Sequence, residues 1–218
     1  MSDLADMRRG YGDVPGHRLD EHTVAPTWHE QLRAWFDAAL AQFGDRPIEL
    51  NAMQVATVDA HGHPAVRTVL LKDLDERGIA FYTNYQSDKG RELLAHPFAA
   101  AVIHWGPQER QVRISGPVTR VDRAESAAYF ATRPRGSQIS AWASPQSAVV
   151  QSRAVLEEAV RTLDERYDGS DVPTPPHWGG LRIAPTSVEF WQGRADRLHD
   201  RVRYRLADAT WVVERLAP

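Results

Sequence analysis

No cysteine occurs among the 218 residues. This excludes disulfide bonds, thiolate catalysis and cysteine-based zinc sites, and it fits a protein of the reducing cytoplasm. No uninterrupted apolar run approaches the roughly 20 residues that a membrane-spanning helix needs. No apolar stretch follows Arg8 and Arg9 to make a signal peptide. We therefore expect a cytoplasmic protein without a membrane partner.

Excess charge of either sign is also missing, since the formal net charge is -3. That balance gives no reason to expect a nucleic-acid partner. The glycine-rich phosphate loops GxGxxG and GxxxxGK[ST] are absent, as are the metalloprotease motif HExxH and the hydrolase motif GxSxG. His61 and His63 lie on a Gly/Pro turn with no evident partner, so we predict no metal site.

What the sequence does contain is a series of short strands. Residues 1–26 are polar and predict a flexible N-terminal arm, and residues 27–218 are expected to form a single domain. Thr27 and Glu30 have capping-box spacing, and the apolar residues after them predict a helix that ends at Gly44. Further helices are predicted at 89–95, 124–132 and 150–167, with a turn at 73–78 and a connection at 133–149. Strands are predicted at 53–58, 66–72, 79–83, 98–105, 110–116, 118–121, 181–184, 188–192, 197–206 and 211–216. The pattern indicates a mainly β protein, an antiparallel barrel with peripheral α-helices.

A row of basic side chains is predicted in the segment 197–201. If that segment is a strand, Arg197, His199 and Arg201 share one face. Two permanent cations and one group that titrates near neutrality suit an anionic ligand with a proton or hydride handled beside it. An exposed basic edge that only prevents aggregation has the same pattern. The row alone leaves both interpretations open.

Other polar groups have the composition of a phosphate site. Tyr129, Arg133 and Ser137 recur every four residues, and Pro134 predicts that they lie at a helix-to-loop corner. Lys89 follows hydroxyl residues at a predicted helix start, where phosphate binds favourably. Polar residues at the solvated end of an ordinary helix would give the same sequence pattern.

Two strands and one loop add further polar candidates. Arg67 and Lys72 are five residues apart, so a regular strand would point them to opposite faces. Gln111 alternates with apolar neighbours and faces solvent or a ligand. The Gln146–Ser147 pair lies in a loop, where an amide and a hydroxyl could contact a planar heterocycle.

Together these segments resemble the pyridoxamine/pyridoxine 5′-phosphate oxidase family over nearly the whole chain. The segments that carry the resemblance are RTVLLK at 67–72, FYTNYQSDKG at 81–90, ERQVRISG at 109–116, YFATRPRGSQISAWAS at 129–144, QS at 146–147, WGG at 178–180 and VEFWQGRADRLHDR at 188–201. The resemblance implies an antiparallel split β-barrel and a homodimer with FMN bound where the subunits meet. It implies oxidation of pyridoxine 5′-phosphate or pyridoxamine 5′-phosphate to pyridoxal 5′-phosphate, with O₂ reduced to H₂O₂.

The resemblance also implies roles for individual residues. The residues that would hold FMN are Arg67, Thr68, Val69, Leu70, Leu71, Lys72, Tyr82, Thr83, Lys89, Gln111, Gln146, Ser147, Trp191 and Arg201. The residues that would bind the substrate phosphate are Lys72, Tyr129, Arg133 and Ser137. Arg197 and His199 would be catalytic and bracket the substrate ring, while Arg8 and Tyr11 belong to an arm that can close over the site.

Three positions depart from the family pattern. Asp88 stands where many members carry Arg against the flavin phosphate, and an acid there would repel the phosphate unless it points away. Gly10 replaces a frequent Glu, and Leu50 follows Glu49 where Pro is common. Two other functions stay open: a split-barrel flavin or deazaflavin enzyme with another substrate, and a non-catalytic protein that stores pyridoxal 5′-phosphate or FMN.

Overall fold

The structure is a computed structural model that describes residues 7, 10–12 and 18–218. Half of the predicted arm, including Arg8, lies outside these residues. The first helix, α1 (Trp28–Phe43), begins with the predicted capping box: Thr27 Oγ1 accepts from the Glu30 backbone N–H at 3.3 Å, and Glu30 accepts from the Thr27 N–H at 3.1 Å. Its apolar face, which includes Trp28, Leu32 and Trp35, is buried against the sheet.

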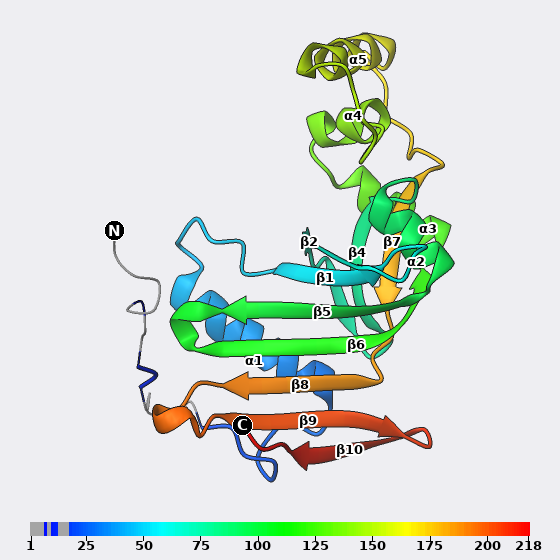
Figure 1. Ribbon diagram of the computed structural model, residues 1–218. Coiled ribbons are helices and arrows are strands. Elements are labelled where there is room, and N and C mark those ends of the chain that lie inside the picture. Colours follow the sequence, from blue (N-terminus) through cyan, green and yellow to red (C-terminus); the bar gives the residue numbers. More distant parts are fainter. Residues whose placement is uncertain (1–6, 8–9, 13–17) are drawn as a thin grey trace.

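A curled antiparallel sheet forms most of the molecule (Figure 1). Its main path runs β10-β9-β8-β6-β5-β1-β2. A branch leaves this path at β6, where β7 pairs with β6, β4 pairs with β7, and β3 pairs with β4. The strands are β1 (Ala52–Val58), β2 (Pro64–Leu70), β3 (Asp73–Asp75), β4 (Gly78–Asn84), β5 (Phe98–Trp105), β6 (Arg110–Arg120), β7 (Trp178–Ile183), β8 (Ser187–Gln192), β9 (Asp200–Ala207) and β10 (Thr210–Arg215). The prediction of a mainly β, antiparallel fold with peripheral helices is confirmed.

The long strand β6 joins the two parts of the sheet. Its first half pairs with β8 from Arg110 to Ser115, and its end pairs with β7 from Val118 to Arg120. The sequence predicted two strands here, at 110–116 and 118–121, and the structure has one continuous strand. The curl that follows brings β4, which pairs with β7, close to β2.

The remaining helices are α2 (Asp88–Ala95), α3 (Arg123–Ala131), α4 (Arg135–Ala143) and α5 (Arg153–Arg166), with short 3-10 turns η2 (Gly106–Gln108) and η3 (Ala195–Arg197). The α4–α5 pair projects away from the sheet in Figure 1. The predicted connection over 133–149 is corrected, because it contains the helix α4. Pro134 is the N-cap of α4, and its φ of -53° suits a helix start. No helix within the described ranges has the length and apolar character needed to cross a membrane.

The predicted strand at 197–206 begins only at Asp200. Asp196 and Arg197 have φ values of 54° and 62°, in the left-handed region, and form the end of η3. Arg197 and His199 therefore do not alternate with Arg201 along one strand. The prediction that these three side chains share one strand face is wrong. The predicted turn at 73–78 is also corrected, because Asp73–Asp75 pairs with β4 as the strand β3.

Candidate functional site

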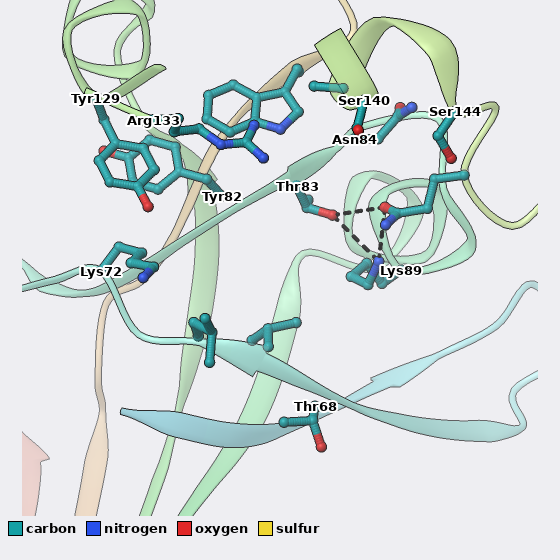
Figure 2. A pocket seen from close by; sticks show the side chains of 15 residues that line it. Thr68, Lys72, Tyr82, Thr83, Asn84, Lys89, Tyr129, Arg133, Ser140 and Ser144 are labelled. Atoms are coloured by element: carbon teal, nitrogen blue, oxygen red, sulfur yellow. Dashed lines mark hydrogen bonds between the residues drawn. The ribbon is translucent and has the colours of Figure 1, made fainter. Parts of the chain in front are cut away.

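A cavity of about 470 Å³ opens between β2, β4, α4 and the loop after it (Figure 2). Ten of the predicted site residues line it: Thr68, Val69, Leu70, Lys72, Tyr82, Thr83, Lys89, Tyr129, Arg133 and Gln146. The sequence did not single out five others: Asn84, Ser140, Ala141, Ser144 and Trp178. The cavity thus collects one large group of the predicted residues from four separate segments of the chain.

An aromatic stack forms one wall of this cavity. The rings of Tyr82 and Tyr129 stack with centroids 4.0 Å apart, and Trp178 stacks on Tyr82 at 5.4 Å. Burial raises the pKa of the Tyr82 hydroxyl, which keeps this group neutral. A Cβ on Gly180 would lie 2.6 Å from the Val121 side chain and 2.9 Å from the Tyr82 ring, so a glycine at this position lets the stack form.

Arg133 lies at the edge of the stack, between the end of α3 and the start of α4. Its Cζ is 4.8 Å from the Trp178 ring centroid, a cation–π arrangement. Its Nη1 is buried and has no hydrogen-bond partner among the described residues. Burial lowers the pKa of the guanidinium, although an arginine remains charged. A desolvated cation with an unpaired N–H group is suited to an anion such as phosphate.

Lys89 stands on the other side of the cavity, in the first turn of α2 (Figure 2). Its Nζ donates to Gln146 Oε1 at 3.1 Å and to the hydroxyls of Thr83 and Ser87, both at 3.3 Å. Burial, and next the positive charge of Arg67, lower the pKa of Lys89. These three acceptors are all neutral oxygens, so the ammonium group could also bind an anionic ligand.

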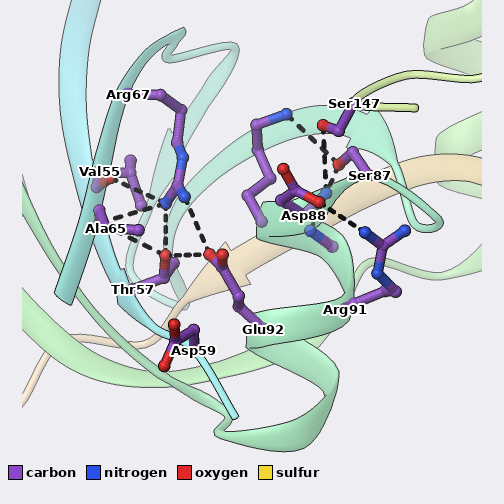
Figure 3. A network of polar contacts seen from close by, with 12 residues as sticks. Val55, Thr57, Asp59, Ala65, Arg67, Ser87, Asp88, Arg91, Glu92 and Ser147 are labelled. Carbon is purple, nitrogen blue, oxygen red and sulfur yellow. Dashed lines mark hydrogen bonds and ion pairs between the residues drawn. The ribbon is translucent and has the colours of Figure 1, made fainter. Parts of the chain in front are cut away.

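Arg67 and Lys72 are placed differently, as their odd spacing predicts. Lys72 lines the cavity just beyond β2. Arg67 lies beneath α2, where its Nη2 is 2.9 Å from Glu92 Oε2 (Figure 3). Leu71 is buried in the core, and Ser137 and Ser147 are not among the residues that line the cavity. Ser147 Oγ instead accepts from the Asp88 backbone N–H at 3.2 Å.

A second group of predicted residues forms a row across three strands. Gln111 of β6 is the register partner of Trp191 of β8, and Trp191 is the register partner of Arg201 of β9. The Arg201 guanidinium is fixed from two sides, by Glu189 Oε1 at 2.8 Å and by the Ala217 carbonyl at 2.7 Å. Its hydrogen bond with Glu189 raises the pKa of Arg201, so the cation is permanent.

Tyr11 and His199 extend this row. The His199 ring lies 4.7 Å from Trp191, and Tyr11 packs edge-on against both, at 5.5 Å from Trp191 and 5.2 Å from His199. The Arg194 backbone N–H donates to His199 Nδ1 at 3.1 Å, which leaves Nε2 to carry the proton of the neutral ring. Arg197 is exposed at the end of η3.

The two groups lie apart within one chain. None of Gln111, Trp191, Arg197, His199 and Arg201 lines the cavity. In Figure 1 the orange turn between β8 and β9, which holds Arg197, is at the opposite end of the sheet from β4 and α4. A ligand that contacts both groups would require a second copy of the chain.

The chain matches two family descriptions. Residues 36–167 match "Pyridoxamine 5'-phosphate oxidase", and residues 178–218 match "Pyridoxine 5'-phosphate oxidase C-terminal dimerisation region". A pyridoxine/pyridoxamine 5′-phosphate oxidase of Saccharopolyspora erythraea is 55% identical over 217 residues, covering 99% of this chain and 95% of that protein. One of Salinibacter ruber is 53% identical over 221 residues, with full coverage of both.

Solved structures have the same fold. PhzG from Burkholderia lata, determined with tetrahydrophenazine-1-carboxylic acid, is 28% identical and has a TM-score of 0.87, covering 96% of this chain and all of that one. An FMN-binding protein of Nostoc punctiforme, related to pyridoxamine 5′-phosphate oxidase, is 20% identical with a TM-score of 0.69, covering 90% and 99%. These similarities establish the predicted split-barrel fold.

Proposed function

This chain belongs to the pyridoxamine 5′-phosphate oxidase family, and from that premise we propose that it oxidises pyridoxine 5′-phosphate and pyridoxamine 5′-phosphate to pyridoxal 5′-phosphate. The reaction would use FMN and O₂ and form H₂O₂ in the cytoplasm, as a step of vitamin B6 synthesis and salvage. One observation carries the substrate assignment: the half-buried Arg133 guanidinium, with a buried and unpaired Nη1, lies beside a stack of aromatic rings.

The residues present fit FMN as the cofactor. Lys89 offers a desolvated ammonium group among hydroxyl and amide oxygens, and residues 68–70 of β2 and Gln146 line the same cavity. We propose that Lys89, Thr83 and Gln146 hold the phosphate end and that the β2 residues contact the ring system. When bound, FMN would supply the two-electron chemistry, because it can take a hydride from C4′ of the substrate and pass electrons to O₂.

The substrate phosphate is proposed to bind at the opposite side of the cavity. Arg133 and Lys72 would give charge-assisted hydrogen bonds, with the Tyr129 hydroxyl beside them. These contacts are remote from the reacting carbon, so their binding energy can orient C4′ for hydride transfer.

The second group would complete the site from the partner subunit of a homodimer. Gln111, Trp191 and Arg201 would contact FMN, and Arg197 and His199 would contact the substrate ring and hold a proton near its reacting group. A match to a dimerisation region over residues 178–218, which include β8 and β9, supports this arrangement. Tyr11 already packs on Trp191 and His199, which supports closure of the arm over the site.

Anaerobic mixing of the FMN-loaded protein with pyridoxine 5′-phosphate tests the proposal. We expect the absorbance of oxidised FMN to be lost rapidly, and to recover in air as pyridoxal 5′-phosphate forms. Bound FMN that is not reduced by either phosphorylated substrate would rule out the oxidase. The result would then favour a storage protein or an enzyme with another substrate.

The pH dependence of FMN binding tests the role of Lys89. Because a protonated ammonium group attracts phosphate, and because burial lowers the pKa of Lys89, FMN affinity should fall as the pH rises, starting below the usual lysine range. In Lys89→Met the affinity should be about tenfold weaker at pH 7, and the alkaline decrease should be absent. Quenching of flavin fluorescence measures both effects. An unchanged pH profile in Lys89→Met would contradict the assignment.

A further inference from the structure

A partly buried ion pair lies beneath α2, outside the cavity (Figure 3). Glu92 Oε2 accepts from Arg67 Nη2 at 2.9 Å and from the hydroxyl of Thr57, and that hydroxyl accepts from Arg67 Nη1. The side chains of Glu92 and Arg67 are only 13% and 21% exposed, and Thr57 is buried. The pair is therefore shielded from solvent and held in one geometry.

Lys89 lies one helical turn before Glu92 on the same helix. Burial, and next the positive charge of Arg67, lower the pKa of Lys89, whereas the negative charges of Asp88 and Glu92 act in the opposite direction. Two cations thus lie close enough to repel each other, and Glu92 is the carboxylate bonded to one of them. Without that carboxylate, Arg67 and Lys89 would be an unbalanced pair of partly buried positive charges.

We propose that Glu92 is an internal counter-ion that sets the affinity for FMN. It stabilises the FMN-free protein because it balances Arg67 and Lys89. It weakens FMN binding because its negative charge opposes the flavin phosphate that Lys89 would attract. This inference rests on the proposed function, because it takes FMN as the ligand and Lys89 as part of its phosphate site.

Asp88 differs from Glu92 although both are acids of α2. Its carboxylate is 2.5 Å from Arg91 Nη2, and its side chain is 58% exposed. A neighbouring guanidinium balances this charge, and solvent screens it. The repulsion expected from an acid at position 88 is therefore reduced, and we assign the larger effect to Glu92.

The test is Glu92→Gln, which keeps an oxygen acceptor for Arg67 and Thr57 but removes the charge. Dissociation constants for FMN and for riboflavin, which lacks the phosphate, are measured by flavin fluorescence. We expect the FMN Kd to fall about fivefold and the riboflavin Kd to stay unchanged. The Tm of the FMN-free protein should fall at the same time. Tighter binding combined with lower stability would not follow from a purely structural role.

Two further variants make the comparison specific. Glu158→Gln removes one carboxylate from α5, where Glu158 pairs with Arg161, and should change neither Kd. Asp88→Asn should change the FMN Kd less than Glu92→Gln does. An unchanged or weaker FMN affinity in Glu92→Gln, or an equal change for riboflavin, would overturn the proposal. If the unsubstituted protein bound riboflavin and FMN equally or bound neither, the proposed phosphate site would itself be wrong.

Discussion

Replacing Arg133 with alanine is expected to lower kcat/KM for pyridoxine 5′-phosphate by several hundredfold. The guanidinium is half-buried before any ligand binds, with its Nη1 shielded from solvent, so a substrate phosphate gains a strong charge-assisted hydrogen bond there. Loss of one partner of a buried charge pair costs about 3–4 kcal/mol, and about 1.4 kcal/mol corresponds to a factor of ten. Steady-state assays of pyridoxal 5′-phosphate formation measure the effect.

Two comparisons distinguish a defect in substrate binding from a general loss of folding or of FMN binding. The Kd for FMN should change little in Arg133→Ala, because Lys89 and Gln146 lie on the other side of the cavity. Arg161→Ala, a substitution of the same kind on exposed α5, should keep full activity. A normal kcat/KM in Arg133→Ala would show that the substrate phosphate binds elsewhere.

A heterodimer of two inactive variants is expected to recover about half the activity of the unsubstituted dimer. Arg133 lies in the cavity group, whereas Arg197 lies in the second group at the far end of the sheet. Arg197→Ala alone should remove most turnover and leave FMN bound. In a dimer of Arg133→Ala with Arg197→Ala, one composite site carries both substitutions and the other carries neither. Co-expression with two different tags isolates this heterodimer for assay.

The matched control pairs two variants of the same group. A heterodimer of Arg133→Ala with Lys72→Ala has one defect in each composite site, since both residues line the cavity. It should recover no activity. If the Arg133→Ala and Arg197→Ala heterodimer stayed as inactive as its parents, the two groups would not share a site across subunits.

Local patterns predicted the elements whose residues interact with near neighbours. The capping box of Thr27 and Glu30, the alternation in β5 and the helix at α2 are fixed by contacts within a few residues. The segment at 197–199 was predicted wrongly because its residues have good strand composition. Its left-handed φ values at Asp196 and Arg197 are not visible in an alternation pattern.

The sequence singled out ten of the residues that line the cavity but did not predict how they are arranged. Arg133 and Lys72 came from charge patterns and the family resemblance, whereas Trp178 was missed as a wall of the cavity. Trp178 reaches the stack only because β7 pairs with β4, a contact between segments about a hundred residues apart. Pro134 suggested the end of a helix, but it also suits the start of one, so α4 was missed.

The row of Gln111, Trp191 and Arg201 has a consequence for which changes of length the chain can tolerate. Because these residues are register partners across three strands, they occupy one line of the sheet. A one-residue insertion in β8 before Trp191 would turn that side chain to the opposite face and break the row. A one-residue deletion there would do the same. Natural variation in length should therefore be absent from β8 and concentrate in the turn at 208–209, which only joins β9 to β10.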